Sequence, residues 1–171
     1  INGDIIFDVT SASMRFAGTT RFTTARLASN NATFQTSPGF VLADAVVVEG
    51  AAPGQRVLIG AVGGTGTLTI APTGSVRVLS GAGGGLTIQN SNVLTLINNG
   101  TISNETTNRS LTFNNSVVTN NGVIQATAAG GTVDLSPTTL TNAASGSLLA
   151  ASGTTFSIGG AWSNDGVISS D

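Results

Sequence analysis

Cysteine, histidine and lysine are absent from this chain, and their absence removes the most common ways of building a catalytic or metal-binding site. Without cysteine there are no disulfides, no thiolate nucleophile and no cysteine metal ligands. Without histidine there is no Ser-His-Asp or Cys-His arrangement and no ordinary zinc site. Without lysine there is no Schiff base and no standard phosphate-binding loop. We therefore predict no catalytic, cofactor-binding or metal-binding residues, and we do not expect an enzyme.

Charged residues are also scarce, at 8% of the 171 residues, and the formal net charge is only −2. Arg15, Arg21 and Arg26 occur near the N-terminus, spread among threonine and alanine. This spacing is typical of a solvated strand face, so we predict no nucleic-acid partner. Apolar residues make up 40% of the chain, which is enough for a core. No uninterrupted apolar run approaches the roughly 20 residues of a membrane span, so none is predicted.

What the sequence does contain is a repeat. Asparagine recurs at a constant step of 22 residues, at Asn98, Asn120, Asn142 and Asn164. A period in this range is typical of repeat proteins, in which each unit buries its apolar face against its neighbours. An asparagine at a corner tolerates left-handed backbone angles, and its amide can bond to its counterparts in adjacent coils. We predict that the four residues form a structural ladder.

An apolar residue lies two positions before each asparagine of the ladder. These residues are Leu96, Val118, Leu140 and Trp162. Strand alternation puts residues two apart on the same side of the backbone, which predicts one inward-facing column of the core. Core packing is accordingly our interpretation of Trp162, and stacking on a carbohydrate is the alternative.

The third copy of the repeat departs from the pattern at its corner. The other three copies have glycine two positions after the asparagine, whereas the third has Ala144. We predict a two-residue insertion there, because loop corners tolerate such changes. Gly146 would then be the turn glycine, and Leu148 would take the place of the isoleucine found in the other copies.

A second segment in each unit alternates apolar, polar and apolar residues, the pattern of a strand with one buried face. It occurs at 68–70, 86–88, 111–113, 133–135 and 156–158. With the strands that end near Leu96 and Ile102, each unit holds about three short strands separated by Gly, Asn, Ser or Pro corners. The predicted fold class is therefore all-β: a right-handed parallel β-helix (β-solenoid) with coils of about 22 residues.

Residues 1–56 follow the period less closely, although short strand-like runs alternate with turn signals there. We predict that the solenoid continues through them, with a brief helix at 24–29 as the alternative. No linker is recognisable, so residues 1–171 are predicted to form a single β-solenoid domain. Neither end shows a charged or proline-guarded cap. We therefore expect a fragment or processed part of a longer chain, or a subunit that stacks on other copies of itself.

Paired carboxylates would be the remaining route to an enzyme, because glycoside hydrolysis usually needs two acids facing one bond. At offsets of 22 residues, Asp134 meets Thr112 and Phe156, and Asp165 meets Ala143. No acid stacks on another acid, so a paired-carboxylate site is not expected.

N-glycosylation sequons are numerous, but chance supplies them in a chain this rich in asparagine, serine and threonine. They begin at Asn31, Asn99, Asn104, Asn108 and Asn114. We do not expect them to be modified as a rule.

Three segments carry a resemblance to a known class of proteins. They are the glycine-rich run at 57–70, Asn98-Asn99-Gly100-Thr101-Ile102, and Asn120-Asn121-Gly122-Val123-Ile124. They resemble the repeats of bacterial autotransporter passengers and filamentous-haemagglutinin-like β-helical exoproteins, over about residues 57–171. The resemblance implies a secreted, cell-surface bacterial protein with a right-handed β-helix. Those families include adhesins, toxin-delivery stalks and matrix proteins, so the resemblance implies an architecture more than an activity.

Three hypotheses for the function stay open at this point. The first is a structural and adhesive β-solenoid shaft on a bacterial surface or in extracellular matrix, with host or matrix glycans as candidate partners. The second is a self-assembling extracellular filament subunit that stacks head to tail through its coil ends. The third is a carbohydrate-active β-helix protein, which stacked acids would favour. The expected location is outside the bacterial cell.

Overall fold

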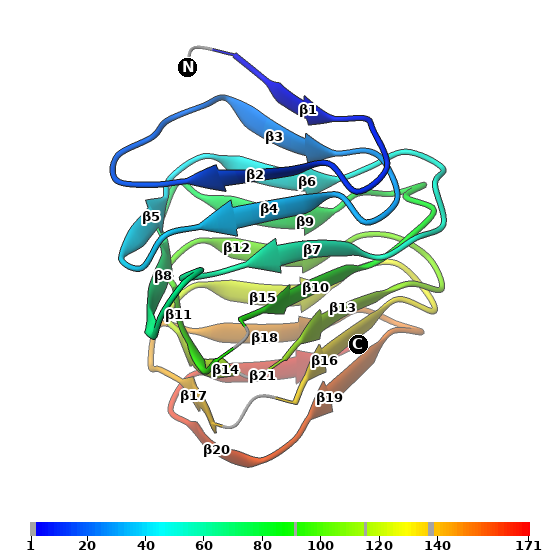
Figure 1. Cartoon of the computed structure of the whole chain (residues 1–171). Coiled ribbons are helices and arrows are strands. Elements are labelled where there is room, and N and C mark those ends of the chain that lie inside the picture. Colours follow the sequence, from blue (N-terminus) through cyan, green and yellow to red (C-terminus); the bar gives the residue numbers. More distant parts are fainter. Residues whose placement is uncertain (1–2, 91, 115, 137–138) are drawn as a thin grey trace.

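Three parallel β-sheets run the length of the molecule. The computed structural model describes residues 3–90, 92–114, 116–136 and 139–171. The sheets contain eight, seven and six strands, and the chain visits them in turn, so that successive coils stack on one another (Figure 1). The predicted all-β parallel solenoid is confirmed, with about seven coils. Within the described residues there is no helix long and apolar enough to cross a membrane.

Each sheet is built from every third strand of the chain, with small departures near the N-terminus. The eight-stranded sheet consists of β1 (Ile5–Phe7), β3 (Thr24–Leu27), β6 (Ala45–Val48), β9 (Ser75–Val78), β12 (Thr101–Asn104), β15 (Val123–Ala126), β18 (Ser147–Ala150) and β21 (Val167–Ser170). The seven-stranded sheet consists of β2 (Ser13–Phe16), β4 (Thr33–Thr36), β7 (Arg56–Ile59), β10 (Leu86–Gln89), β13 (Ser110–Phe113), β16 (Thr132–Leu135) and β19 (Thr155–Ile158). The six-stranded sheet consists of β5 (Phe40–Leu42), β8 (Gly66–Ile70), β11 (Leu94–Asn98), β14 (Ser116–Asn120), β17 (Thr139–Asn142) and β20 (Ala161–Asn164).

Alternate side chains of all three sheets fill the interior. In β16, the buried Val133 and Leu135 flank the outward-facing Asp134. Parallel pairing repeats this pattern from coil to coil and stacks Leu86, Leu111 and Val133 in one column. Complete burial of each such side chain contributes roughly 1.5–3 kcal/mol. The core is therefore a set of apolar columns that run along the axis of the stack.

One predicted alignment is wrong. Alternation suggests that segment 68–70 is equivalent to segment 86–88, but the structure places them in different sheets. Leu68 of β8 pairs with Leu96, whereas Leu86 of β10 pairs with Arg56. Alternation reports only which face of a strand is buried, and all three sheets bury one face in the same way. The two segments are alike in sequence without occupying equivalent positions.

The solenoid continues through the N-terminal region as predicted, and the alternative of a helix at 24–29 is wrong. Residues Thr24–Leu27 form β3, which pairs with β1 on one side and β6 on the other. These two neighbours bond its backbone, and the strand conformation buries Ala25 and Leu27 in the core. A helix at the same place would leave both neighbouring strands with an unpaired edge.

Coil length explains why the repeat is hard to see in the first half of the chain. Val46 pairs with Val76, and Val76 pairs with Ile102, so both steps exceed the 22-residue spacing of the later coils. The additional residues lie in corners, which accept insertions more readily than strands do.

A loop closes the N-terminal end of the core. Phe22, between β2 and β3, is only 4% exposed. Its ring centroid lies 5.4 Å from that of Phe16 and 5.7 Å from that of Phe34. Arg21 holds the loop through an ion pair of 2.9 Å with Asp44, and the Phe22 amide donates to the same carboxylate. Aromatic packing, rather than a charged or proline-guarded cap, therefore covers the core at this end.

Candidate functional site

The four ladder asparagines lie in one column of the six-stranded sheet. Asn98, Asn120, Asn142 and Asn164 are consecutive Cα partners in β11, β14, β17 and β20. Each Nδ2 donates a hydrogen bond to the Oδ1 of the next asparagine, at 2.8, 2.8 and 2.7 Å. The first three side chains are almost completely buried. The side-chain amides thus form a continuous chain of hydrogen bonds along the stack.

Each ladder amide also bonds to the backbone of the following corner. The second N–H of Asn98 donates to the carbonyl of Val123 at 3.1 Å. Asn120 does the same with Ser147 at 3.2 Å. An asparagine amide has two donors, so these bonds satisfy the nitrogen of each buried residue. The ladder therefore fastens adjacent coils at the corner that joins the six-stranded sheet to the eight-stranded sheet.

Close packing at this corner explains its glycines. A Cβ added to Gly146 would lie 2.3 Å from the carbonyl oxygen of Asn120 and 2.4 Å from Oδ1 of Asn142. A real Cβ cannot occupy that space, so the position requires glycine. Leu148 pairs with Ile124, and the ladder resumes in register beyond it. The predicted two-residue insertion is confirmed, with Gly146 as the turn glycine.

The apolar column beside the ladder changes character at its last member. Leu96, Val118, Leu140 and Trp162 are consecutive Cα partners. The first three are buried, whereas Trp162 is 55% exposed. Core packing does not describe Trp162, because β20 is the last strand of its sheet and no further coil covers the indole. The four residues are in the expected register, but Trp162 at the end of the column is exposed rather than buried.

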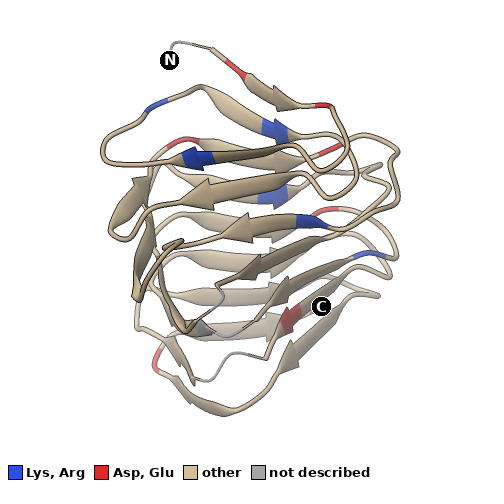
Figure 2. Ribbon diagram, in the orientation of Figure 1, with Lys and Arg blue, Asp and Glu red and all other residues tan. Residues whose placement is uncertain are grey.

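The arginines that suggested a solvated strand face are largely paired with carboxylates. On the eight-stranded sheet, Arg26 bridges Asp4 and Glu49 at 2.8 and 2.9 Å. Arg77 contacts Glu105 at 2.7 Å. Hydrogen bonding from Arg77 is the main cause that lowers the pKa of Glu105, although burial opposes it. Figure 2 shows that the basic residues lie mostly in the N-terminal coils, where acidic residues accompany them.

A fully buried arginine is the main feature that sequence reasoning missed. Arg56 begins β7 and occupies an inward position opposite Leu86. Its guanidinium donates only to backbone carbonyls: Nε to Leu27, Nη1 to Ala52 and Gly54, and Nη2 to Ala28 and Glu49. These bonds use all five N–H donors of the side chain. Burial lowers the pKa of Arg56, but the guanidinium stays protonated because an arginine side chain keeps its charge even inside a protein.

The buried guanidinium explains the lengthened corner around it. The carbonyls of residues 49–54 wrap around the side chain, and Gly84 of the next coil lies directly against it. A Cβ on Gly84 would lie 2.4 Å from Nη1, so only glycine fits. The sequence alone gives no clear signal for this site, because Val57, Leu58 and Ile59 are all apolar and alternation cannot show which of them is buried.

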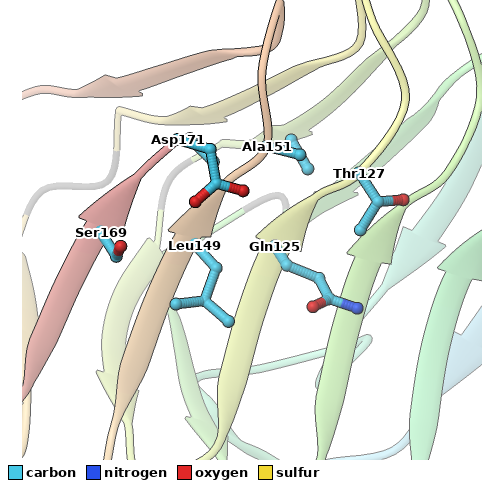
Figure 3. A pocket seen from close by; sticks show the side chains of 8 residues that line it. Gln125, Thr127, Leu149, Ala151, Ser169 and Asp171 are labelled. Carbon is cyan, nitrogen blue, oxygen red and sulfur yellow. The ribbon is translucent and has the colours of Figure 1, made fainter.

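A shallow groove of about 240 Å³ lies on the outer face of the eight-stranded sheet, near the C-terminal end. Gln125, Leu149 and Ser169 form one outward column of its lining, and Thr127 and Asp171 lie beside that column (Figure 3). The groove brings together none of the residues that the sequence singles out. It is a depression between neighbouring outward columns of side chains.

The acidic residues form no metal or carboxylate site in the part of the chain that the structure describes. No group of three or more His, Cys, Asp or Glu is placed there to hold a metal ion. Asp134 lies between Thr112 and Ser157, rather than Phe156, because Val133 pairs with Phe156. The acid still has no acidic neighbour in its column.

The sequons differ in accessibility. Asn104 is fully buried, and its amide donates to two backbone carbonyls, so a glycan cannot be attached there in the folded chain. Asn31 and Asn108 are exposed and have positive φ angles at turns. Asn99 accepts a hydrogen bond from Asn121 at 2.9 Å. The sequon at Asn114 includes residue 115, which lies outside the described residues.

No protein-family model, no curated protein and no solved structure significantly matches this chain.

Proposed function

We propose that this chain is a structural and adhesive β-solenoid shaft of a secreted bacterial surface or matrix protein. The observation that carries the proposal is the continuous ladder from Asn98 to Asn164, which locks four coils in register within three uninterrupted parallel sheets. The likeness of its repeats to those of autotransporter passengers and filamentous-haemagglutinin-like exoproteins supports the extracellular, bacterial part of the proposal.

The geometry suits a rigid spacer. Strands in a sheet lie about 4.8 Å apart, so the eight-stranded sheet extends roughly 34 Å along the axis. Each coil contacts only its neighbours, so length and stiffness come from adding coils. The buried amide chain adds directional bonds to the apolar columns, and it resists sliding of one coil over the next because a shift would leave buried amides unpaired.

The filament alternative is less well supported, because the two ends of the stack do not match. The column that ends at Asn164 begins at Leu42, which pairs with Ile70. Head-to-tail stacking would set an apolar side chain against the terminal amide. The three sheets also contain unequal numbers of strands, so a second copy could not continue all of them without a gap. The loop with Phe22 covers the N-terminal end of the core in addition.

The enzyme alternative has no supporting observation. Arginines engage Asp4, Asp44, Glu49 and Glu105, and Asp134 has no acidic neighbour in its column. We therefore propose that the chain acts through its shape and outer surface.

Localisation and adhesion can be tested together in the cells that produce the protein. An antibody raised against the folded chain should label intact cells as strongly as permeabilised cells, and external protease should remove the label. Adhesion to immobilised glycans and matrix proteins should fall when the segment is deleted. The matched control replaces the segment with a Gly/Ser-rich linker of the same number of residues. This linker keeps the number of residues in the protein but removes the stiffness of the solenoid.

Two results would contradict this proposal. Labelling only after permeabilisation would exclude a surface protein. Full adhesion with the Gly/Ser replacement would show that neither the stiffness nor the surface of the solenoid is needed.

A further inference from the structure

We infer that the C-terminal coil is a docking surface for one more parallel coil, with asparagine at the ladder position, an apolar residue two positions earlier and glycine two positions later. The docking surface consists of β20, β21 and the corner between them. The inference rests on the proposed shaft function, but it concerns a different surface and can be tested on the isolated chain.

Exposed apolar side chains mark this surface. Trp162, Val167 and Ile168 are 55%, 52% and 48% exposed. Trp162 extends the column of the buried Leu140, and Ile168 extends the column of the buried Leu148. Trp162 and Ile168 therefore face the axis of the stack, where every earlier coil has another coil over it, whereas Val167 pairs with the partly exposed Ser147 on the outer face. A matching occupant must present apolar residues at both of these columns.

The ladder supplies direction and specificity. The amides of Asn98, Asn120 and Asn142 each donate to the asparagine of the next coil toward the C-terminal end. Asn164 accepts from Asn142, and among the described residues its own amide nitrogen donates only to the carbonyl of Gly166, at 3.2 Å. Its second N–H is the open end of the chain of amides. An occupant that places a side-chain carbonyl at this position continues the ladder, and asparagine does so with the same geometry.

The corner adds a size requirement. A Cβ on Gly122 would lie 2.2 Å from the carbonyl oxygen of Gly100, and one on Gly166 would lie 2.3 Å from that of Gly146. Each coil therefore needs glycine at the point where it crosses the corner of the coil before it. The same requirement applies to any strand pair that packs on Gly166. Together the three features specify a segment such as 94–104 of this chain, which contains Leu96, Asn98, Gly100 and Ile102 in the required order.

A second whole copy does not present this pattern at its N-terminal end. The column that would meet Asn164 begins there with Leu42, and Phe22 closes the core beneath it. The occupant we infer is therefore a coil of the ladder type, and end-to-end dimerisation is an alternative outcome that the experiment must distinguish.

Trp162 provides a direct readout, because it is the only tryptophan in the chain. We would titrate the protein with a synthetic peptide of residues 94–104, which contains no tryptophan. Binding should bury the indole and shift its emission to shorter wavelength in a saturable way. A peptide with Asn98→Ala should bind about fivefold to tenfold more weakly, because it cannot accept from Asn164. A Thr95→Ala peptide, altered on the outward face, is the matched control and should bind like the parent.

A tethered version removes the entropy that a free peptide loses on binding. A copy of residues 106–126 added after Asp171 would supply the strands of one further coil and place the copies of Val118 and Asn120 over Trp162 and Asn164. This variant should show blue-shifted Trp162 emission and a higher Tm than the parent chain. The same extension with alanine in place of its copy of Asn120 should raise the Tm less.

Three results would overturn the inference. Unchanged Trp162 emission in the tethered variant would show that the surface does not accept a coil. Equal affinity of the parent and Asn98→Ala peptides would show that the ladder does not select its occupant. A concentration-dependent blue shift without peptide, with dimers in sedimentation experiments, would identify a second copy as the occupant. None of these results bears on whether the protein is found at a cell surface, so the two proposals fail separately.

Discussion

Replacing Asn120 with alanine tests the ladder at its most demanding point. The Asn120 side chain accepts from Asn98 at 2.8 Å and donates to Asn142 at 2.8 Å and to the carbonyl of Ser147 at 3.2 Å. The variant loses all three bonds, each worth about 0.5–1.5 kcal/mol net, and it leaves Oδ1 of Asn142 without its donor. We expect Asn120→Ala to lower the free energy of unfolding by about 3 kcal/mol.

Asn164→Ala is the matched control, with the same chemistry at the exposed end of the same column. It removes one partner of Asn142, whose nitrogen keeps the carbonyl of Val167 at 3.1 Å. We expect a loss of less than about 1 kcal/mol, because the exposed groups can bond to water. Urea unfolding followed by circular dichroism gives both values. Equal losses for Asn120→Ala and Asn164→Ala would refute the buried-ladder argument. Asn115 lies off the 22-residue ladder and would be a control by sequence, but it is outside the described residues.

Three further predictions concern other features of the fold. Arg56→Lys should lower the free energy of unfolding by about 2–4 kcal/mol, because an ammonium group has three donors for the five carbonyls that surround the guanidinium. Unchanged stability would show that these five hydrogen bonds do not stabilise the fold. Gly146→Ala should lower the Tm, because the added Cβ would lie 2.3 Å from the carbonyl oxygen of Asn120. Gly64→Ala should not, because no atom lies within 4 Å of the position of its added Cβ. The pKa of Glu105 is below its ordinary value of 4.5, so its pairing with Arg77 stabilises the fold above that pH. This stabilisation should disappear as pH falls through the lower folded-state pKa. In urea titrations, native and Arg77→Gln proteins should therefore converge in acid, and a constant difference would be inconsistent with the ion pair.

The sequence predicts the regular half of the molecule well because the ladder fixes its register. A period of 22 residues puts Asn98, Asn120 and Asn142 side by side, and the structure bonds them in that order. The insertion before Leu148 could be found as well, because a corner glycine has a strict steric requirement at Gly146.

The features that sequence reasoning missed depend on what lies next to a residue in space. Periodicity places Trp162 in an inward column but cannot show that its sheet ends there. The cap at Phe22 lies outside any strand, so alternation gives no signal for it. The burial of Arg56 could not be predicted, because a charged residue is rarely placed in a core and its carbonyl partners lie as many as 29 residues away in the chain.

Hydrogen exchange of the asparagine side-chain amides tests whether the buried ladder fastens adjacent coils together. Two-dimensional NMR on the labelled protein resolves each side-chain NH₂ group and measures its exchange rate with solvent. We predict strong protection for Asn98, Asn120 and Asn142, which are buried and doubly bonded, and fast exchange for the exposed Asn164. Fast exchange of all four amides would contradict the ladder as the element that locks the coils together.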